Sequence, residues 1–134
     1  MTVLHGSCLC GAIGFEFETE DLDVTACHCG QCRRWSGHYW ASVSGPRDGL
    51  SIKKGEEKVR WVKSSPIARR GFGACCGSAL FWHGEGLSAY KDRISVAAGA
   101  IAGDAPLKLT QHIFVADKGC YYHIMDGLPQ TGGE

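Results

Sequence analysis

The sequence predicts a mainly β domain built from short antiparallel strands. Glycine accounts for 19 of the 134 residues, about twice the usual ~7%, and such an excess is typical of many turns. Apolar and polar residues alternate in short runs, whereas no amphipathic helical pattern continues for more than about two turns. Because strands do not alternate with long helices, a β-dominated architecture is favoured over an α/β one.

Three strands and a helical turn are expected in the first third of the chain. Apolar side chains at every second position of residues 13–17 predict a half-buried strand, and residues 24–27 predict a short second one. Residues 32–37 are expected to form a helical turn, because Gly37 provides the left-handed conformation that commonly ends a helix. Residues 39–44 predict the next strand.

The remaining strands are expected to be equally short. Residues 50–53 and 58–63 are predicted to pair as a hairpin, with Val59 and Trp61 facing the core. Further strands are predicted at residues 68–72, 79–83, 94–98 and 109–116. The tail from residue 126 onward is expected to be irregular and partly frayed.

Charge and hydropathy argue against several classes of protein. Fourteen Lys and Arg residues balance fourteen Asp and Glu residues, so no electrostatic reason favours a nucleic acid or an anionic membrane as partner. No apolar stretch approaches the ~18 residues that a membrane helix needs, and the N-terminus lacks a secretory signal. We therefore expect a single domain over residues 1–134 in the cytoplasm, and the sequence leaves its oligomeric state open.

The eight cysteines carry most of the functional information. Disulfides are disfavoured in the cytoplasm, so these cysteines indicate metal ligands or reactive thiols. Cys27, Cys29 and Cys32 have the spacing C-x-C-x-x-C. Strand alternation places Cys27 and Cys29 on one face and directs His28 away, while a tight turn through Gly30 can bring Cys32 to the same point. Three converging thiolates predict a zinc site with an open fourth position.

A second group of cysteines predicts a closed, structural zinc site. Cys8 and Cys10 share one face of an extended segment, and the simplest partition joins them with Cys75 and Cys76. Such a site would tie the N-terminus to the middle of the chain. The eighth cysteine, Cys120, has no partner at a suitable spacing and is expected to be a free thiol without a role.

Several short motifs extend over nearly the whole chain in a characteristic order. They are residues 6–11 (GSCLCG), 27–33 (CHCGQCR), 36–37, Phe72, 76–78, 80–81, 112–115, Lys118 and 126–130. In this order they resemble the glutathione-dependent formaldehyde-activating enzyme family, which also includes centromere protein V. The resemblance implies a β-tent fold of small antiparallel sheets with zinc-binding turns. It also implies a structural zinc on the C-x-C and C-x-x-C-G motifs and a second zinc at the C-x-C-x-x-C active site.

One position departs from this family pattern. The C-x-x-C-G motif would place its first cysteine at position 73, where this chain has Gly73, and Cys75 lies directly before Cys76 instead. Neighbouring side chains project apart, so two adjacent thiolates on one tetrahedral ion require a strained turn. Three alternatives follow: Cys75 supplies the fourth sulfur by a local rearrangement, another residue replaces it, or the site is empty.

The resemblance implies a carbon–sulfur lyase that joins glutathione and formaldehyde into S-hydroxymethylglutathione. At the three-cysteine site, a thiol such as glutathione would be deprotonated and would attack a small aldehyde held nearby. Arg33 and Arg34 are candidates for pairing with glutathione carboxylates, and Trp35 for lining a pocket. Solvated surface arginines and a core tryptophan are the alternative interpretations. We expect no direct chemical role for His28.

Three other functions are weighed against the lyase. A non-catalytic binding module would use both zinc sites for folding alone. A thiol redox protein would contain no metal and would form a reversible disulfide among Cys27, Cys29 and Cys32. Nucleic-acid binding of the zinc-ribbon type is disfavoured by the zero net charge and by the lack of a basic cluster.

Overall fold

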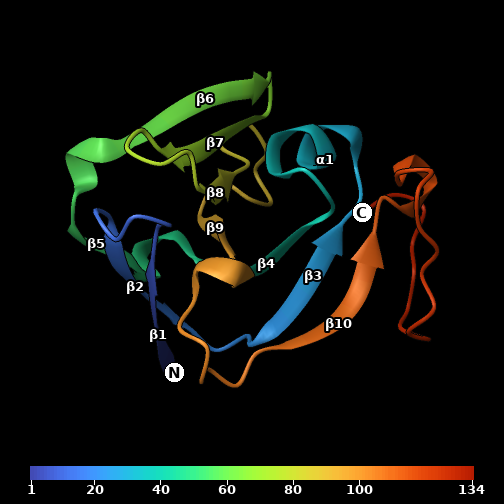
Figure 1. The fold of residues 1–134 in the computed structure, drawn as a ribbon, viewed down its shortest axis with the longest axis horizontal. Coiled ribbons are helices and arrows are strands. Elements are labelled where there is room, and N and C mark those ends of the chain that lie inside the picture. The colour runs from blue at the N-terminus through green and yellow to red at the C-terminus, as the bar shows by residue number, and fades with distance from the viewer.

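The computed structural model describes residues 1–134 as two β-sheets connected by loops and short helices (Figure 1). The smaller sheet is antiparallel, with the order β1 (Thr2–Ser7), β2 (Gly14–Thr19) and β5 (Leu50–Lys54). The larger sheet has the order β10 (Lys108–Ile113), β3 (Asp23–Cys27), β4 (Trp40–Pro46), β9 (Arg93–Ala97), β8 (Ala79–His83), β7 (Ala68–Gly73) and β6 (Val59–Ser65). The helices are α1 (Gly30–Ser36), η1 (Arg47–Gly49), η2 (Glu56–Lys58), η3 (Ala98–Ala100) and η4 (Val115–Asp117). The prediction of a mainly β fold is confirmed.

The larger sheet is mixed rather than purely antiparallel. Its edge strand β10 runs parallel to β3, and Figure 1 shows the two strands side by side although most of the chain separates them in sequence. A parallel pair cannot be joined by a tight turn, so the intervening chain supplies the crossover. This pairing sets Ile113 beside Cys27, and β10 thereby positions the start of the three-cysteine motif.

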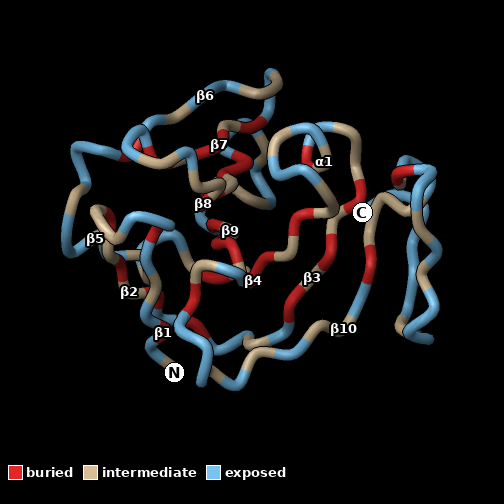
Figure 2. Tube along the Cα trace, viewed as in Figure 1, coloured by how far each residue is buried: buried red, intermediate tan, exposed pale blue.

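The main hydrophobic core lies between the two sheets. Phe15 and Phe17 point inward from β2, and the alternation predicted for this strand is confirmed by its burial pattern. Phe15 meets Phe81 of β8 edge to face, with ring centroids 5.3 Å apart. Figure 2 shows buried residues between the two sheets and also along β3 and β4 of the larger one. Burial of each Phe or Leu side chain stabilises the fold by about 1.5–3 kcal/mol, so the packing between the two sheets holds them together.

The predicted hairpin between residues 50–53 and 58–63 is wrong. The first segment forms β5 and pairs with β2, whereas the second forms β6 and pairs with β7, in the other sheet. The intervening Gly55 has a φ of 71°, and its position is packed against the backbone of Ala12. This close approach makes the connection a crossover between sheets. Val59 is buried as predicted, and Trp61 packs against the core with its ring stacked on Phe81.

The last predicted strand is shorter than expected, and the tail is better anchored. β10 ends at Ile113 because Phe114 adopts a left-handed conformation with a φ of 55°, and η4 follows. The tail is irregular, as predicted, but the segment 129–133 is held by backbone hydrogen bonds. The amide of His112 donates to the Pro129 carbonyl at 2.9 Å, and the amide of Thr131 donates to the His112 carbonyl at 3.0 Å.

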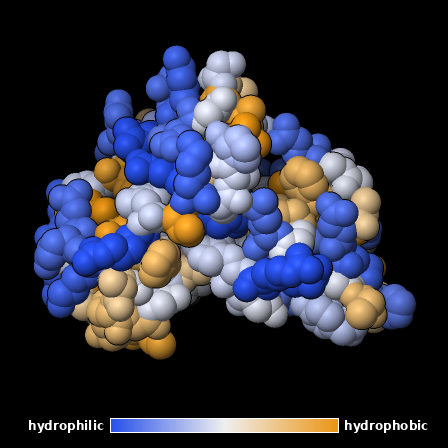
Figure 3. All heavy atoms as spheres, turned by 90° about the horizontal axis from the view of Figure 1, so that it is seen from above, coloured by the Kyte–Doolittle hydropathy of each residue, from blue (hydrophilic) through white to orange (hydrophobic).

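The surface carries no broad apolar face in the view of Figure 3, where hydrophobic residues form small patches among hydrophilic ones. Large apolar side chains that are exposed include Leu9, Val62 and Met125, which lie far apart in the chain. None of the helices combines the length and the apolar character that crossing a bilayer requires.

Candidate metal centres

Four cysteines from two distant turns meet at the first centre. Cys8 and Cys10 follow β1, whereas Cys75 and Cys76 lie in the turn between β7 and β8. Their sulfur atoms all lie within 4.8 Å of one another. The sulfurs of Cys10 and Cys75 are separated by 3.3 Å although the residues are 65 positions apart. The structure therefore brings together the four cysteines that the sequence analysis assigned to a structural site.

Most sulfur separations at the first centre fit a tetrahedral zinc ion. A zinc–sulfur bond of about 2.3 Å gives sulfur–sulfur edges of about 3.8 Å. The separations are 3.7 Å for Cys8–Cys10, 4.0 Å for Cys8–Cys75 and 3.9 Å for Cys75–Cys76. The Cys10–Cys75 separation of 3.3 Å is shorter than such an edge. The adjacent cysteines reach this geometry because Gly77, with a φ of 79°, donates its amide to the Gly73 carbonyl at 2.7 Å and reverses the chain.

Gly73 itself lies beside the first centre. A Cβ atom at this position would be 3.4 Å from Cys76 Sγ and 3.7 Å from Cys75 Sγ. A cysteine at position 73 would therefore direct its sulfur toward the same point. Among the three alternatives raised by the sequence, this arrangement favours Cys75 as the fourth sulfur.

Ionisation of the thiols at the first centre is interdependent. Hydrogen bonding with Cys10 raises the pKa of the Cys75 thiol to about 12, whereas a hydrogen bond with Ser78 Oγ lowers the pKa of Cys76 to about 5. Neighbouring thiols resist losing all their protons because each thiolate repels the next. A divalent cation relieves this repulsion, so the chemistry of the donor set also suits a metal.

The second centre is built on the start of α1. Cys27 ends β3, Cys29 is the N-cap of α1, and Cys32 is buried within the helix, with the three sulfurs within 4.8 Å of one another. Cys29 Sγ accepts a hydrogen bond from the Cys32 amide at 3.3 Å. Hydrogen bonding with Cys27 lowers the pKa of Cys29 to about 2, and the same interaction raises the pKa of Cys27. The helix ends at Gly37 with a φ of 92°, as predicted.

A buried arginine that the sequence analysis missed lies against the second centre. Arg70 of β7 is only 4% exposed. Its Nη1 donates to Cys32 Sγ at 3.4 Å and its Nη2 donates to Gln31 Oε1 at 3.4 Å. The guanidinium also lies over Trp35, 5.0 Å from the ring centroid. No local spacing links Arg70 to Cys32, and only the strand predicted at residues 68–72 could have suggested that one of its side chains points inward.

His28 points into a hydrogen-bonded network instead of toward a metal. It is 1% exposed, and its Nε2 lies 2.9 Å from His112 Nδ1 while its Nδ1 is hydrogen-bonded to the Tyr122 hydroxyl. His112 Nε2 continues the chain to Asp126 Oδ2 at 2.8 Å. Burial, followed by the charge of His112, lowers the pKa of His28 to about 4. These partners could not be predicted from the local sequence, because they come from β10 and the tail.

The three residues expected to contact the substrate, Arg33, Arg34 and Trp35, differ in their surroundings. Trp35 packs against Trp40, with ring centroids 5.0 Å apart, and forms a wall of the second centre. Arg34 is exposed, and Arg33 is half-buried. Neither arginine is paired with a carboxylate of the chain, since the salt bridges involve other residues. The guanidinium of Arg34 is therefore open to an external anion, whereas that of Arg33 is buried at Nε.

Three buried nitrogen atoms around the second centre lack a hydrogen-bond partner. They are Arg33 Nε, Trp40 Nε1 and Arg70 Nε. Trp40 belongs to the same buried cluster as Cys32, and Arg70 donates to Cys32 Sγ through Nη1. Unpartnered donors are costly to bury. The donor set and its surroundings thus fit a centre that carries negative charge, as a zinc ion held by three thiolates does.

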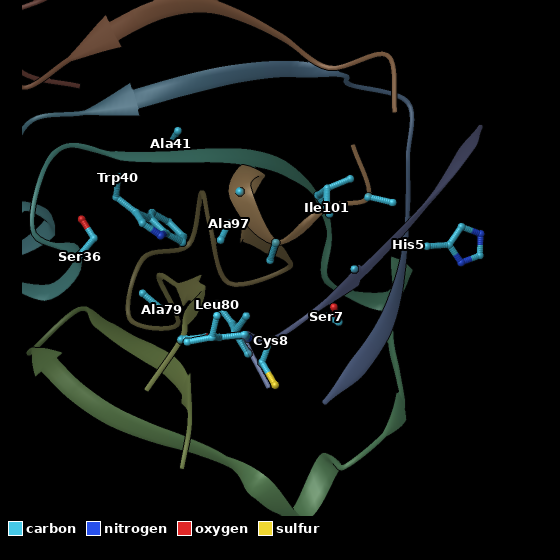
Figure 4. Close-up of a pocket in the computed structure, with 16 residues that line it drawn as sticks. His5, Ser7, Cys8, Ser36, Trp40, Ala41, Ala79, Leu80, Ala97 and Ile101 are labelled. Carbon is cyan, nitrogen blue, oxygen red and sulfur yellow. The ribbon is translucent and has the colours of Figure 1, made fainter. Parts of the chain in front are cut away.

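A cleft of about 800 Å³ opens beside the first centre, and its lining contains no cysteine of the second (Figure 4). Cys8 of the first centre lines one part of it. Trp40 and Ala97, which also pack around Cys32, line another part. In Figure 4 the Trp40 side chain projects from β4 toward Ala79 and Leu80. The cleft and the second centre therefore share a wall.

Comparison with known proteins places this arrangement in a family. The family described as "Glutathione-dependent formaldehyde-activating enzyme" (GFA) matches residues 3–117. The chain belongs to the GFA family. An uncharacterised lyase of Schizosaccharomyces pombe is 30% identical to this GFA protein over 82 residues, covering 61% of the chain and 58% of the relative. The chain thus matches less than two thirds of that relative's length.

The fold of this GFA protein is also found in a solved structure. A crystal structure of a Rhodobacter sphaeroides protein superposes with a TM-score of 0.65 and 21% sequence identity, covering 95% of this chain and 99% of that one. At this identity the likeness concerns the fold alone.

Proposed function

We propose that this GFA protein is a zinc-dependent carbon–sulfur lyase. Its substrate would be the adduct of glutathione, or of a similar small thiol, with a small aldehyde, as in S-hydroxymethylglutathione formation. The observation that carries the proposal is the convergence of Cys27, Cys29 and Cys32 beside the buried guanidinium of Arg70. A three-sulfur site suits reversible binding of a fourth ligand, whereas a four-sulfur site is closed.

The two centres would have different roles in this enzyme. Cys8, Cys10, Cys75 and Cys76 would hold a structural zinc, and the three-cysteine centre would hold the reactive one. A zinc ion bound there would supply a Lewis acid that favours the thiolate form of a substrate thiol. In the synthetic direction, the thiol sulfur forms a bond to the carbonyl carbon, and the proton released from the thiol ends on the carbonyl oxygen. The reverse reaction breaks the same carbon–sulfur bond.

The chain's own side chains would favour this reaction by binding and by excluding water. Arg70 stabilises negative charge on sulfur, because its guanidinium is buried and donates directly to Cys32 Sγ. Trp35 and Trp40 pack around the centre and limit access of water from that side. Arg33 and Arg34, which have no carboxylate partner in the chain, would bind the carboxylates of glutathione.

Exchange spectroscopy tests the proposal directly. Glutathione and ¹³C-formaldehyde form the adduct spontaneously. The measured quantity is therefore how much the zinc-loaded protein accelerates the exchange of ¹³C between free formaldehyde and the glutathione adduct. We expect the wild type to accelerate exchange and Cys32→Ser, which removes one sulfur of the second centre, to abolish the acceleration. Equal exchange rates with wild type, with Cys32→Ser and with buffer alone would eliminate the lyase function.

A non-catalytic zinc-stabilised binding module is the second candidate. The position of the cleft favours it, because Cys27, Cys29 and Cys32 are absent from the cleft lining. Cobalt substitution separates the two functions, since cobalt spectra report the ligand set. The lyase requires one centre whose spectrum changes when a thiol is added, whereas the binding module requires both centres to be closed and unresponsive.

A further inference from the structure

Arg70 is a buried cation without a carboxylate partner. Its side chain is 4% exposed, and its polar neighbours are Cys32 Sγ, at 3.4 Å from Nη1, and Gln31 Oε1, at 3.4 Å from Nη2. The remaining nitrogen, Nε, is buried without a partner. The amide oxygen of Gln31 is neutral, and the guanidinium also lies over the ring of Trp35. None of the salt bridges of the chain involves Arg70, so Cys32 Sγ is the one hydrogen-bond partner of this guanidinium that can carry a negative charge.

The neighbouring arginine shows a different environment. Arg69 projects to the other side of β7, where its Nε lies 3.2 Å from Glu85 Oε2 and its guanidinium lies 4.2 Å from the Trp61 ring centroid. A carboxylate thus neutralises Arg69. Burying a charge is unfavourable unless an opposite charge accompanies it, and Arg70 meets this condition only when the sulfurs of the second centre are anionic.

We propose that Arg70 makes the three-cysteine centre selective for an anionic sulfur ligand over a neutral ligand. The inference rests on the proposed function only in taking this centre as an open zinc site. Three thiolates around a divalent ion leave one net negative charge, and a thiolate as fourth ligand adds another. The guanidinium offsets that added charge at close range, in a buried environment where charges interact strongly. A neutral ligand such as imidazole adds no charge and gains nothing from Arg70.

Ligand titrations of the cobalt-substituted protein test this selectivity at a fixed pH. 2-Mercaptoethanol serves as the thiol probe, because it binds as a thiolate and carries no other charge, and imidazole serves as the neutral probe. Arg70→Met removes the charge while keeping an apolar side chain of suitable length, and Arg70→Gln keeps hydrogen-bonding groups. Arg69→Met is the matched control, since it removes the adjacent arginine from the opposite face.

We expect Arg70→Met and Arg70→Gln to weaken 2-mercaptoethanol binding by about 10- to 100-fold, because a nearby opposite charge typically favours an anionic group by this factor or more. Imidazole binding should change by less than about threefold in both variants, and Arg69→Met should leave both affinities unchanged. A parallel loss of both probes would show a merely structural role and overturn the proposal. An unchanged thiol affinity in Arg70→Gln would overturn it as well, even where Arg70→Met fails to fold.

These affinities are independent of turnover. If exchange spectroscopy shows no lyase activity but the ratio of the two affinities still depends on Arg70, the proposed function fails and the selectivity stands. If the protein accelerates exchange but Arg70→Gln keeps the wild-type ratio, the selectivity fails and the proposed function stands.

Discussion

Cys75 is proposed to take the place of the cysteine ligand that the family spacing assigns to position 73. The Cβ contacts at Gly73 show that both positions face the same centre, so the ligand can be moved from one to the other. We predict that Cys75→Ser lowers the zinc content by about one equivalent per chain, because three sulfurs make a weaker structural site. Metal analysis of purified protein measures this loss.

Adding Gly73→Cys to Cys75→Ser should restore the lost zinc. The new side chain meets Ile13 Cδ1 at 3.3 Å, a contact that a small movement of a flexible side chain can relieve. Full zinc content in Cys75→Ser alone would show that Cys75 is not a ligand. A double variant that stays deficient would show that the turn cannot accommodate the family spacing.

Residues that carry their chemistry in a local pattern could be predicted, whereas residues that act through tertiary contacts could not. Cys27, Cys29 and Cys32 are separated by one and two residues, so the sequence alone brings their sulfurs together. Arg70 and His112 reach the same region only because β7 and β10 belong to one sheet with β3. A single arginine or histidine in a strand gives no local indication of what it will contact.

At the scale of elements, α1 depends on a glycine at its C-terminus. Gly37 has a φ of 92° and no heavy atom within 4 Å of a Cβ position, so only backbone strain opposes a side chain there. We predict that Gly37→Ala destabilises the protein by about 1 kcal/mol. Gly99→Ala is the control, because Gly99 has equal space and no left-handed conformation. Urea unfolding measures both, and equal stability of the two variants would contradict the prediction.

The tail acts as an anchor for the segment around α1 through two adjacent tyrosines. Tyr122 bonds to buried His28 before the helix, whereas exposed Tyr121 bonds to half-buried His38 after it, at 2.6 Å. We predict that Tyr122→Phe costs about 1–3 kcal/mol of folding free energy, since it leaves a buried ring nitrogen unpaired. Tyr121→Phe, the size-matched control at an exposed site, should cost less than about 0.5 kcal/mol. Urea unfolding measures both losses. An equal loss of unfolding free energy in the two variants would contradict an anchoring role of the Tyr122–His28 hydrogen bond.

Strand positions were more predictable than strand partners. Alternation identifies an extended segment with one buried face, as in β2, but it does not state which strand lies beside it. Adjacent strands usually pair, yet β5 and β6 join different sheets because their connection packs on Ala12. The parallel pairing of β10 with β3 could not be predicted either, since it depends on the path of the whole intervening chain.

In the whole molecule, the first centre acts as a clamp between the sheets. Its cysteines come from the end of β1 in the smaller sheet and from the β7–β8 turn in the larger one. The second centre, by contrast, joins β3 only to the adjoining helix α1. A cross-link that closes a long loop restricts the unfolded chain much more than one that closes a short loop. The two centres should therefore differ in their effect on stability, although each is proposed to hold one metal ion.

Cys10→Ser and Cys29→Ser compare the two centres with a matched substitution. Each variant should lose about one equivalent of zinc, because each removes one sulfur. Cys10→Ser should also lower the free energy of unfolding by about 2–4 kcal/mol, since it opens a clamp between residues 65 positions apart. Cys29→Ser should cost less than about 1 kcal/mol, because the new hydroxyl can still cap α1 and the loop it opens is short. Zinc analysis and urea unfolding of the same samples measure both effects. An equal loss of stability in the two variants would show that the first centre is not the clamp between the sheets.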